Sequence, residues 1–175
     1  MGNCCIDGSI YIRWKPNSCG VYAMNKSVNT IIGLEILFPM RNRDVFDVLL
    51  FRGIDLKKYY FKYVSGEMIS DNGIVRFPST FSFSYFSSIR NLKQSICTLH
   101  CTLFPYGCEA ETIHTYKAFL ESSCEMIILY YDWELEIYCK HIDWMEIIKK
   151  NVNRINGAII NEKTIMNDER KEMYC

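Results

Sequence analysis

The chain has 175 residues, and its 20 Lys and Arg balance its 20 Asp and Glu, so the formal net charge at pH 7 is zero. This balance excludes a surface that binds polyanions over its whole extent. Apolar residues make up 49% and charged residues 23% of the chain, which excludes intrinsic disorder and allows a globular core. A chain of this length usually forms one domain. The aromatic content of 14% favours strands over a helical bundle.

The charges are unevenly distributed along the chain, and the cysteines indicate the redox state of its thiols. Residues 1–64 hold nine Lys and Arg against five Asp and Glu, whereas residues 125–175 hold seven against ten, so the first third is the basic part. The nine cysteines follow no secretory signal, and we therefore expect reduced, partly buried thiols. No apolar run reaches the length of about 18 residues that a transmembrane helix needs. Heavy use of Tyr, Ile, Asn and Lys is typical of AT-rich genomes, such as many viruses carry.

The first half of the chain alternates between strand-like and helix-like patterns. Residues 9–14 alternate in polarity and predict a short strand, and residues 29–38 predict a second strand that stops before Pro39. Residues 44–51 and 55–64 read as two helices, the second capped by Asp55. Asp71-Asn72-Gly73 is a strong turn signal and predicts a hairpin.

Residues 81–104 look like the centre of the fold. Phe81, Phe83 and Tyr85 alternate with serines, and four apolar residues alternate with polar ones between Cys97 and Leu103. A period of two places each apolar set on one face of a strand. We therefore expect two antiparallel strands that share an apolar side.

The second half predicts a helix, two strands and a last helix. Residues 109–120 carry acidic residues where a helix would begin, and residues 126–131 and 133–139 read as tightly joined strands, with one long helix as the alternative. Residues 142–155 place five apolar side chains on one helical stripe, and Gly157 would end this helix. The stripe consists of Ile142, Met145, Ile148, Val152 and Ile155.

These elements predict one compact α+β domain, a mostly antiparallel sheet with three to four helices. We assign residues 1–15 to an N-terminal segment, residues 16–157 to the domain and residues 158–175 to a loose polar C-terminal tail.

The N-terminus is the strongest functional signal. Gly2 fits the glycine that N-myristoylation needs, although Ile6 stands where Ser or Thr is preferred. Cys4 and Cys5 could carry a second acyl chain, and two lipid signals give stable anchoring where one does not. Basic support for a membrane contact would come from Arg13, Lys15 and Lys26. The alternative is that Gly2 is unmodified and the two cysteines only pack.

Two further patterns suggest sites, each with a plainer interpretation. Cys97, Cys101, Cys108 and His114 could ligate zinc, but their spacing and strand position favour buried thiols, so no metal or other cofactor is expected. The alternating acids Asp132, Glu134 and Glu136 read as the solvated face of a strand.

The basic and aromatic residues of the first third suggest a phosphate-binding surface. Arg41, Arg43, Lys57 and Lys58 would contact lipid head groups or ribonucleoprotein. Zero net charge argues against strong phosphate affinity, and we do not expect sequence-specific nucleic-acid binding. Tyrosines 59, 60 and 63 are interspersed but would pack on a sheet. No catalytic motif accompanies the three histidines, so we do not expect an enzyme; a cysteine hydrolase is the remaining catalytic alternative.

The order of the expected elements between residues 29 and 145 is similar to that of the compact matrix proteins of rhabdoviruses. The resemblance rests on the helix pair, the hairpin at Asp71-Asn72-Gly73, the two strands within 81–104, the next helix and the paired strands at 126–139. It implies a non-enzymatic viral protein that binds the inner leaflet of the host membrane, self-associates and links the membrane to the nucleocapsid. It also implies a location in the host cytoplasm, at the inner face of the membrane and in the virion.

The alternative hypothesis is a viral protein that binds and blocks a host immune factor. This protein would be a β-rich module without a membrane anchor, and its N-terminus would be unmodified. Liposome binding and self-association favour the matrix-like function, whereas a monomer that ignores membranes favours the alternative.

Overall fold

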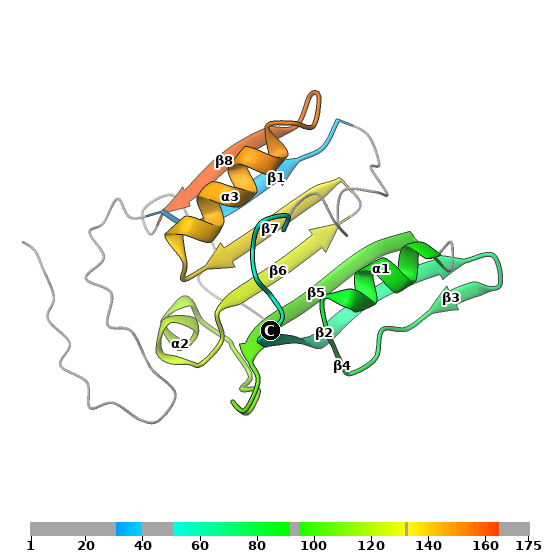
Figure 1. Cartoon of the computed structure of the whole chain (residues 1–175), viewed down its shortest axis with the longest axis horizontal. Helices are drawn as coiled ribbons and strands as arrows, with labels where there is room; N and C mark the ends of the chain where they lie inside the picture. Colours follow the sequence, from blue (N-terminus) through cyan, green and yellow to red (C-terminus); the bar gives the residue numbers. More distant parts are fainter. Residues whose placement is uncertain (1–30, 40–50, 92–94, 132, 165–175) are drawn as a thin grey trace, which may run out of the picture.

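One antiparallel sheet of eight strands organises the computed structural model, which describes residues 31–39, 51–91, 95–131 and 133–164 (Figure 1). Seven strands neighbour one another in the order β3-β2-β5-β6-β7-β1-β8, and β4 pairs with β2 beside this path. The strands are β1 Ile31–Leu37, β2 Tyr59–Ser70, β3 Gly73–Val75, β4 Thr80–Phe81, β5 Ser95–Pro105, β6 Met126–Tyr131, β7 Glu134–Cys139 and β8 Ile159–Thr164.

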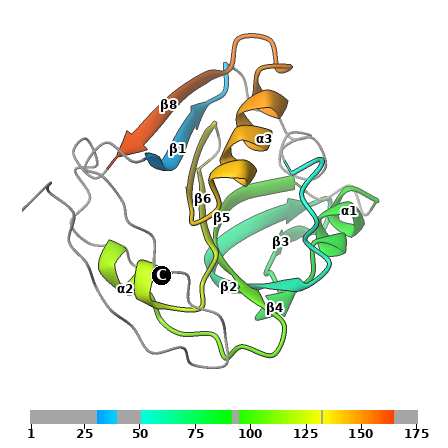
Figure 2. The ribbon, with the colours of Figure 1, turned by 60° about the vertical axis from the view of Figure 1, so that its left-hand side comes forward.

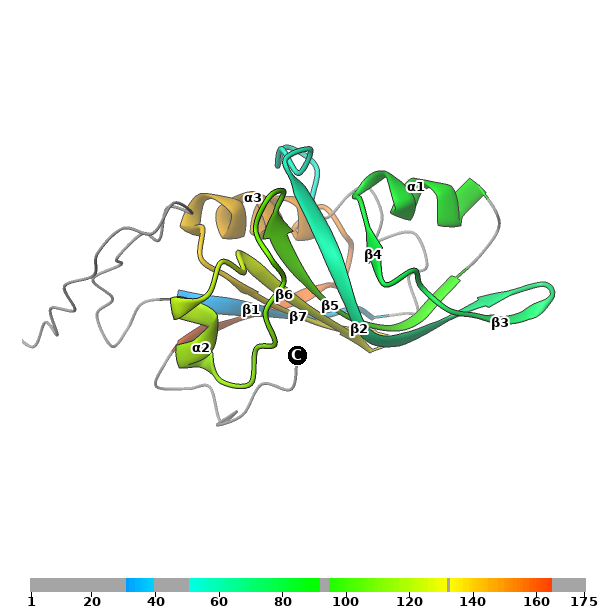
Figure 3. The ribbon, with the colours of Figure 1, turned by 90° about the horizontal axis from the view of Figure 1, so that it is seen from below.

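Helices cover both faces of the sheet. Helix α1 (Ser84–Asn91) and helix α3 (Ile142–Val152) lie on one side, and the short α2 (Tyr116–Glu121) lies on the other (Figure 3). Residues 51–58, which we call the strap, run between α1 and α3 over the same face (Figures 1 and 3). The sheet is strongly twisted, so β1 and β8 lie at a steep angle to β2 and β5 (Figure 2).

The face under α1 and α3 carries the larger core. Alternate residues of β5, among them Leu99 and Leu103, are buried on this side, together with Phe61 of β2. The Phe61 ring stacks on Phe81 with 5.3 Å between centroids and meets Phe86 of α1 edge-on at 5.4 Å. These aromatic contacts fix α1 against the sheet.

The opposite face carries a smaller core beneath α2. Phe104, Ile127 and Tyr138 come from three neighbouring strands and are buried with Phe119 of α2. Helix α2 begins where the side chain of Thr115 accepts a hydrogen bond from the Ala118 amide at 3.1 Å. Strands that are apolar on both sides explain why the central part of the sheet is so rich in Ile, Leu and aromatic residues.

The structure confirms the α+β fold class and several elements. Strand β1 ends before Pro39, and the hairpin of β2 and β3 turns at Asp71-Asn72-Gly73, with Ser70 opposite Gly73. β6 and β7 are antiparallel neighbours, so the single long helix is excluded. On the expected stripe of α3, Met145, Ile148 and Val152 are buried, whereas Ile142 is exposed.

The expected aromatic strand at 81–86 is wrong. Only Thr80 and Phe81 form a strand, which pairs with β2 rather than with β5, and helix α1 begins at Ser84. Phe86 and Ile89 are buried three residues apart, as on a helix face. The apolar spacing therefore fits both the strand period of two and the helical period. Contact with β2 determines which of the two elements forms.

Three other expectations need correction. Residues 59–64 belong to the long strand β2 and not to a helix, because alternate aromatic residues face the two sides of the sheet. The helix expected over 109–120 is confined to Tyr116–Glu121. Residues 159–164 are not part of a loose tail but form β8, which pairs with β1. The strand expected at 9–14 and most of the helix at 44–51 lie outside the described residues.

Gly66 marks an irregularity in the pairing of β2 with β5. Its φ of +137° is a conformation that residues with a side chain rarely adopt. A Cβ atom at this position would lie 2.8 Å from the Cα of Leu99 and closer still to the carbonyl oxygen of Thr98. Both neighbours are backbone atoms of β5, so neither can move aside without disturbing the ladder.

We expect Gly66→Ala to lower the free energy of unfolding by roughly 2–5 kcal/mol, because backbone strain and overpacking add. The control is Gly73→Ala, since Gly73 also has a positive φ of 111° but a methyl group added there would have no atom within 4 Å. This control should lose only about 1–2 kcal/mol. Urea denaturation followed by circular dichroism measures both, and equal losses would contradict the close approach at Gly66.

Candidate functional site

Most of the predicted membrane contacts lie outside the described residues. These are Gly2, Cys4, Cys5, Arg13, Lys15, Lys26, Arg41 and Arg43, and their roles stay predictions. Lys57 and Lys58 are described, and both are exposed in the strap just before β2 begins. The described part of the predicted cationic surface is therefore this pair.

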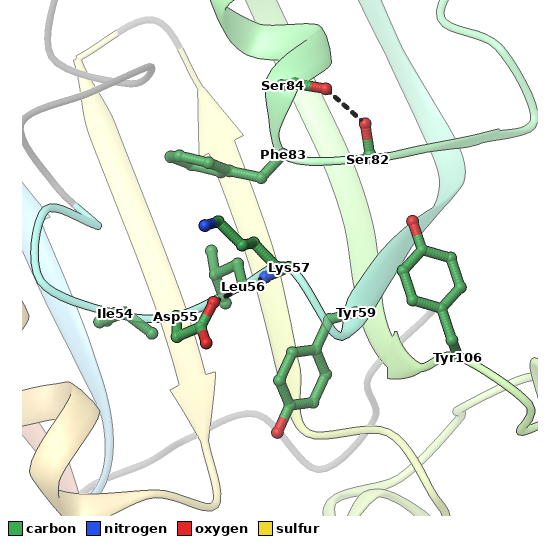
Figure 4. A pocket seen from close by; sticks show the side chains of 9 residues that line it. All are labelled: Ile54, Asp55, Leu56, Lys57, Tyr59, Ser82, Phe83, Ser84 and Tyr106. Atoms are coloured by element: carbon green, nitrogen blue, oxygen red, sulfur yellow. Dashed lines mark hydrogen bonds between the residues drawn. The ribbon is translucent and has the colours of Figure 1, made fainter.

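A pocket of about 530 Å³ opens beside these lysines (Figure 4). Its walls come from three stretches that are distant in the sequence: the strap with the start of β2, the turn that leads into α1, and the residue after β5. The lining residues are Ile54, Asp55, Leu56, Lys57, Tyr59, Ser82, Phe83, Ser84 and Tyr106.

The charged and hydroxyl groups of the pocket come from the strap and from the turn into α1. The Asp55 carboxylate accepts a hydrogen bond from the backbone amide of Lys57 at 3.1 Å, which shapes the strap. The side chain of Lys57 extends towards Phe83 (Figure 4). The hydroxyls of Ser82 and Ser84 are 2.7 Å apart, and Ser84 is the first residue of α1, whose first turn contains no acidic residue.

Aromatic rings form the apolar walls, and two of them are supported by further rings. Phe83 meets Phe51 of the strap edge-on at 6.0 Å, and Tyr59 meets Trp144 of α3 edge-on at 5.3 Å. Tyr106 is 57% exposed, and its amide donates to the Lys58 carbonyl at 2.9 Å. The pocket therefore combines rigid aromatic walls with an exposed amine and two hydroxyls.

A second polar cluster lies elsewhere on the sheet, across β7, β1 and β8. Glu136 is 1% exposed, which contradicts the expected solvated face at this position. Lys163 of β8 lies 3.4 Å from a carboxylate oxygen of Glu136 and 3.5 Å from one of Glu35. Asn161 donates to the other oxygen of Glu35 at 2.7 Å, and the Tyr138 hydroxyl donates to Glu136 at 3.3 Å.

This cluster also holds the metal-type arrangement found among the described residues. Carboxylate oxygens of Glu35, Glu134 and Glu136 lie within 4.8 Å of one another. Lys163 pairs with two of the three carboxylates, so its amine already lies where a metal cation would be attracted. We therefore interpret the cluster as a structural charge network.

The cysteine and histidine array does not assemble into a comparable group. Cys101 is fully buried beneath α1 and α3, Cys97 and Cys108 are partly buried, and His114 is exposed. Among the residues that the structure describes, the four do not bring three ligand atoms as close together as the acidic cluster does. The expectation that the Cys101 thiol is part of the core is confirmed.

A third polar group lies where β7 joins α3. The imidazole of His141 stacks on Trp144 at 4.1 Å between centroids and lies 3.0 Å from a Glu125 carboxylate oxygen. Lys140 donates to the Ser122 carbonyl at 2.5 Å, and burial lowers the pKa of Lys140 while Glu125 acts in the opposite direction. The Cys139 thiol lies against the backbone of His141, whose imidazole is directed to Glu125.

Comparison with known proteins gives a family but no function. A family model described as "Protein of unknown function (DUF2691)" matches residues 31–174. No curated protein matches the chain. No solved structure matches it either. Within the described residues, the helices are all too short or too polar to cross a membrane.

We expect Lys163→Met to lower the free energy of unfolding by about 3–5 kcal/mol, because it leaves the buried Glu136 carboxylate without its cation. The double variant Lys163→Met/Glu136→Gln should regain roughly half of this loss, since the uncompensated charge is then removed. Lys150→Met, on an exposed position of α3, is the control and should change stability by less than about 0.5 kcal/mol. Chemical denaturation measures the free energy of unfolding of each variant. If the double variant does not regain stability relative to Lys163→Met, the result would argue against the charge network.

Proposed function

The chain belongs to this family of unknown function, and we propose that it is a non-enzymatic protein that binds an anionic membrane surface. One observation carries the proposal: Lys57 and Lys58 are exposed next to Tyr106, whose backbone is hydrogen-bonded to Lys58. Cations beside an exposed tyrosine suit the head-group region, where an aromatic ring can enter while amines contact lipid phosphates.

The charge of the strap supports this assignment. Residues 51–58 contain Arg52, Lys57 and Lys58 against the single acid Asp55, and all four side chains are exposed. Each cation near an anionic leaflet contributes about 1 kcal/mol, which gives weak, reversible binding on its own. Stable attachment needs a second signal, and the lipid predicted at Gly2, with Cys4 and Cys5, would supply it.

The finer matrix-like role stays a prediction from the resemblance. Linkage to a nucleocapsid, a virion location and a viral source are expectations to which the described residues add nothing. Partner binding, whether to a second copy or to a host protein, has one supporting observation on another part of the surface.

That observation is an apolar patch at the end of β6, β7, β1 and β8. Tyr131 is 46%, Trp133 59% and Ile159 56% exposed. Glu134 lies opposite Tyr131 on β6 and opposite Leu37 on β1, and Leu37 lies opposite Ile159 on β8, so Tyr131 and Ile159 end one row across four strands that also contains the carboxylate of Glu134. Trp133 precedes Glu134 in the chain. Large exposed aromatic residues that lie together are typical of protein interfaces. The second candidate function is therefore partner binding through this patch.

The double variant Lys57→Gln/Lys58→Gln, which removes both charges, tests the membrane proposal. We expect it to bind mixed phosphatidylcholine–phosphatidylserine vesicles roughly 30-fold more weakly than the wild type, because about 2 kcal/mol of electrostatic attraction is lost. Co-sedimentation at low salt measures the affinity. Lys117→Gln/Lys150→Gln removes the same charge from exposed positions on α2 and α3 and should bind almost normally. An equal loss of vesicle affinity in both variants would show that the vesicles attract the overall charge of the protein. This result would contradict the assigned surface.

The predicted lipid anchor has its own test. We expect the wild type expressed in eukaryotic cells to float with membranes and to carry the mass of an added acyl group, whereas Gly2→Ala and Cys4→Ser/Cys5→Ser should float less. Flotation assays with intact mass spectrometry measure both properties. An unmodified mass in all three proteins would exclude lipidation, and unchanged flotation would then assign the membrane contact to the folded surface.

The partner-binding candidate predicts a change in mass. If the patch joins two copies, the wild type should show concentration-dependent association in sedimentation equilibrium, and Tyr131→Ser/Trp133→Ser should remain a monomer. Ile74→Ser alters a residue that is 69% exposed on β3 at the other end of the sheet, and it should associate like the wild type. A wild type that stays monomeric at all concentrations would leave this patch to a different protein and would contradict self-association through it.

A further inference from the structure

The pocket beside Lys57 has the chemistry of a site for an amphipathic anion. Lys57 and the hydroxyls of Ser82 and Ser84 line it together with Leu56, Phe83 and other apolar side chains. We propose that it binds a phosphate monoester that carries an apolar chain. The proposal deepens the membrane function and rests on it in one respect only: it takes a lipid as the source of that phosphate.

The two serines supply a hydrogen-bond donor for the phosphate. Their hydroxyl oxygens are 2.7 Å apart, so one hydroxyl donates to the other. Only one of the two protons is used in that bond, and the accepting serine keeps its own proton for a third group. The backbone carbonyl of Ser82 is engaged by the Tyr85 amide at 3.0 Å, which holds this turn in place.

Two sources of positive potential favour an anion at these hydroxyls. Ser84 is the first residue of α1, and the absence of acidic residues from the first turn of α1 leaves its dipole uncompensated within the helix. Lys57 lines the pocket from the strap, and its amine is directed towards Phe83, the residue between the two serines (Figure 4). An ammonium and a hydroxyl together match the acceptor-only oxygens of a phosphate.

The apolar walls give the site a preference for a chain beyond the phosphate. Phe83 is held by Phe51 at 6.0 Å and by Phe86 at 6.0 Å, so its ring is a rigid surface. Leu56 is 3% exposed and forms part of the core below. The volume of about 530 Å³ exceeds what a bare phosphate ion fills and falls within the range of small-molecule sites.

Asp55 is the acidic residue among those that line the pocket, and its negative charge disfavours an anionic ligand. This residue therefore provides a further test of the proposal. Its carboxylate accepts the Lys57 amide and would repel a phosphate in the same pocket. Asparagine can accept the same hydrogen bond without the charge. Asp55→Asn should therefore strengthen the binding of an anion, whereas it would weaken the binding of a cation.

The probe is hexyl phosphate, titrated into the full-length protein labelled with ¹⁵N, with hexanol and inorganic phosphate as comparison ligands. We expect saturable amide shifts at residues 54–59 and 82–84, and tighter binding of hexyl phosphate than of either comparison ligand. Lys57→Gln and Ser82→Ala/Ser84→Ala should each weaken binding about tenfold. Asp55→Asn should tighten it several-fold. Spectra of the free variants that overlay the wild-type spectrum establish that each is folded.

Lys58→Gln is the matched control, because Lys58 is the exposed neighbour of Lys57 and does not line the pocket. It should leave the affinity for hexyl phosphate within about twofold. Equal weakening by Lys57→Gln and Lys58→Gln, tighter binding of inorganic phosphate than of hexyl phosphate, or absence of saturable shifts would each overturn the proposal.

Vesicles then identify the source of the phosphate. Lys57-dependent preference for vesicles with phosphatidic acid over vesicles with phosphatidylserine, at matched surface charge, would identify a lipid head group. Binding of hexyl phosphate without any vesicle binding would keep the site, assign it to a soluble phosphate ester and contradict the proposed membrane function. Vesicle binding with no response to hexyl phosphate would support the membrane function and overturn the proposed phosphate site.

Discussion

The pairing of β2 with β5 is the constraint on which the rest of the described structure depends. The two strands are paired from Tyr59 opposite Pro105 to Ile69 opposite Ser95, and this ladder brings the strap and Tyr106 together at the pocket. At one end the strap enters β2, and Tyr106 leaves β5 with its amide on the Lys58 carbonyl. Beside β2, the pairing of Phe81 with Phe61 positions the turn into α1. A small shift in the register of β5 against β2 would therefore separate Tyr106 from the lysine and the serines.

The two faces of the sheet are stabilised by different interactions. Beneath α1 and α3, aliphatic side chains and contacting aromatic rings form the larger apolar core. The other face has an apolar part under α2, and a charged network extends across β7, β1 and β8, where Lys163 pairs with both Glu35 and Glu136. Charges that are buried need partners, so this network depends on β8 being in place. The last described strand thus completes an electrostatic network as well as a sheet.

Sequence patterns predict the elements whose signals are local. The Asp71-Asn72-Gly73 turn and the strands around Trp133 are determined largely by nearby residues, and the structure contains both. The apolar stripe predicts α3 only in part, because Ile142 is exposed and the helix ends at Val152, before Ile155 and Gly157. The patterns of residues 59–64 and 84–91 predict the wrong element, because apolar residues there suit both a period of two and a helical spacing. Pairing of β2 with β4 and β5, a non-local effect, decides the outcome.

The candidate site is predictable only in part, for the same reason. The charge pattern of the sequence alone identifies Lys57 and Lys58. Ser82, Ser84 and Tyr106 carry no motif, and they reach the pocket only because β4 and β5 both pair with β2. The burial of Glu136 escapes prediction because alternation in a strand shows which residues share a face, but it does not show that the face is covered.

The position of β1 between β7 and β8 has a consequence for folding during synthesis on the ribosome. Both partners of this strand, which is mostly buried, are encoded about 100 residues or more after it. At a synthesis rate of about 5–20 residues per second, β1 waits roughly 5–20 s before β7 emerges, and longer for β8. During that time an apolar segment of high β-propensity has no partner in the sheet. Slower synthesis would lengthen this exposure, and the sheet closes only after β8 has emerged.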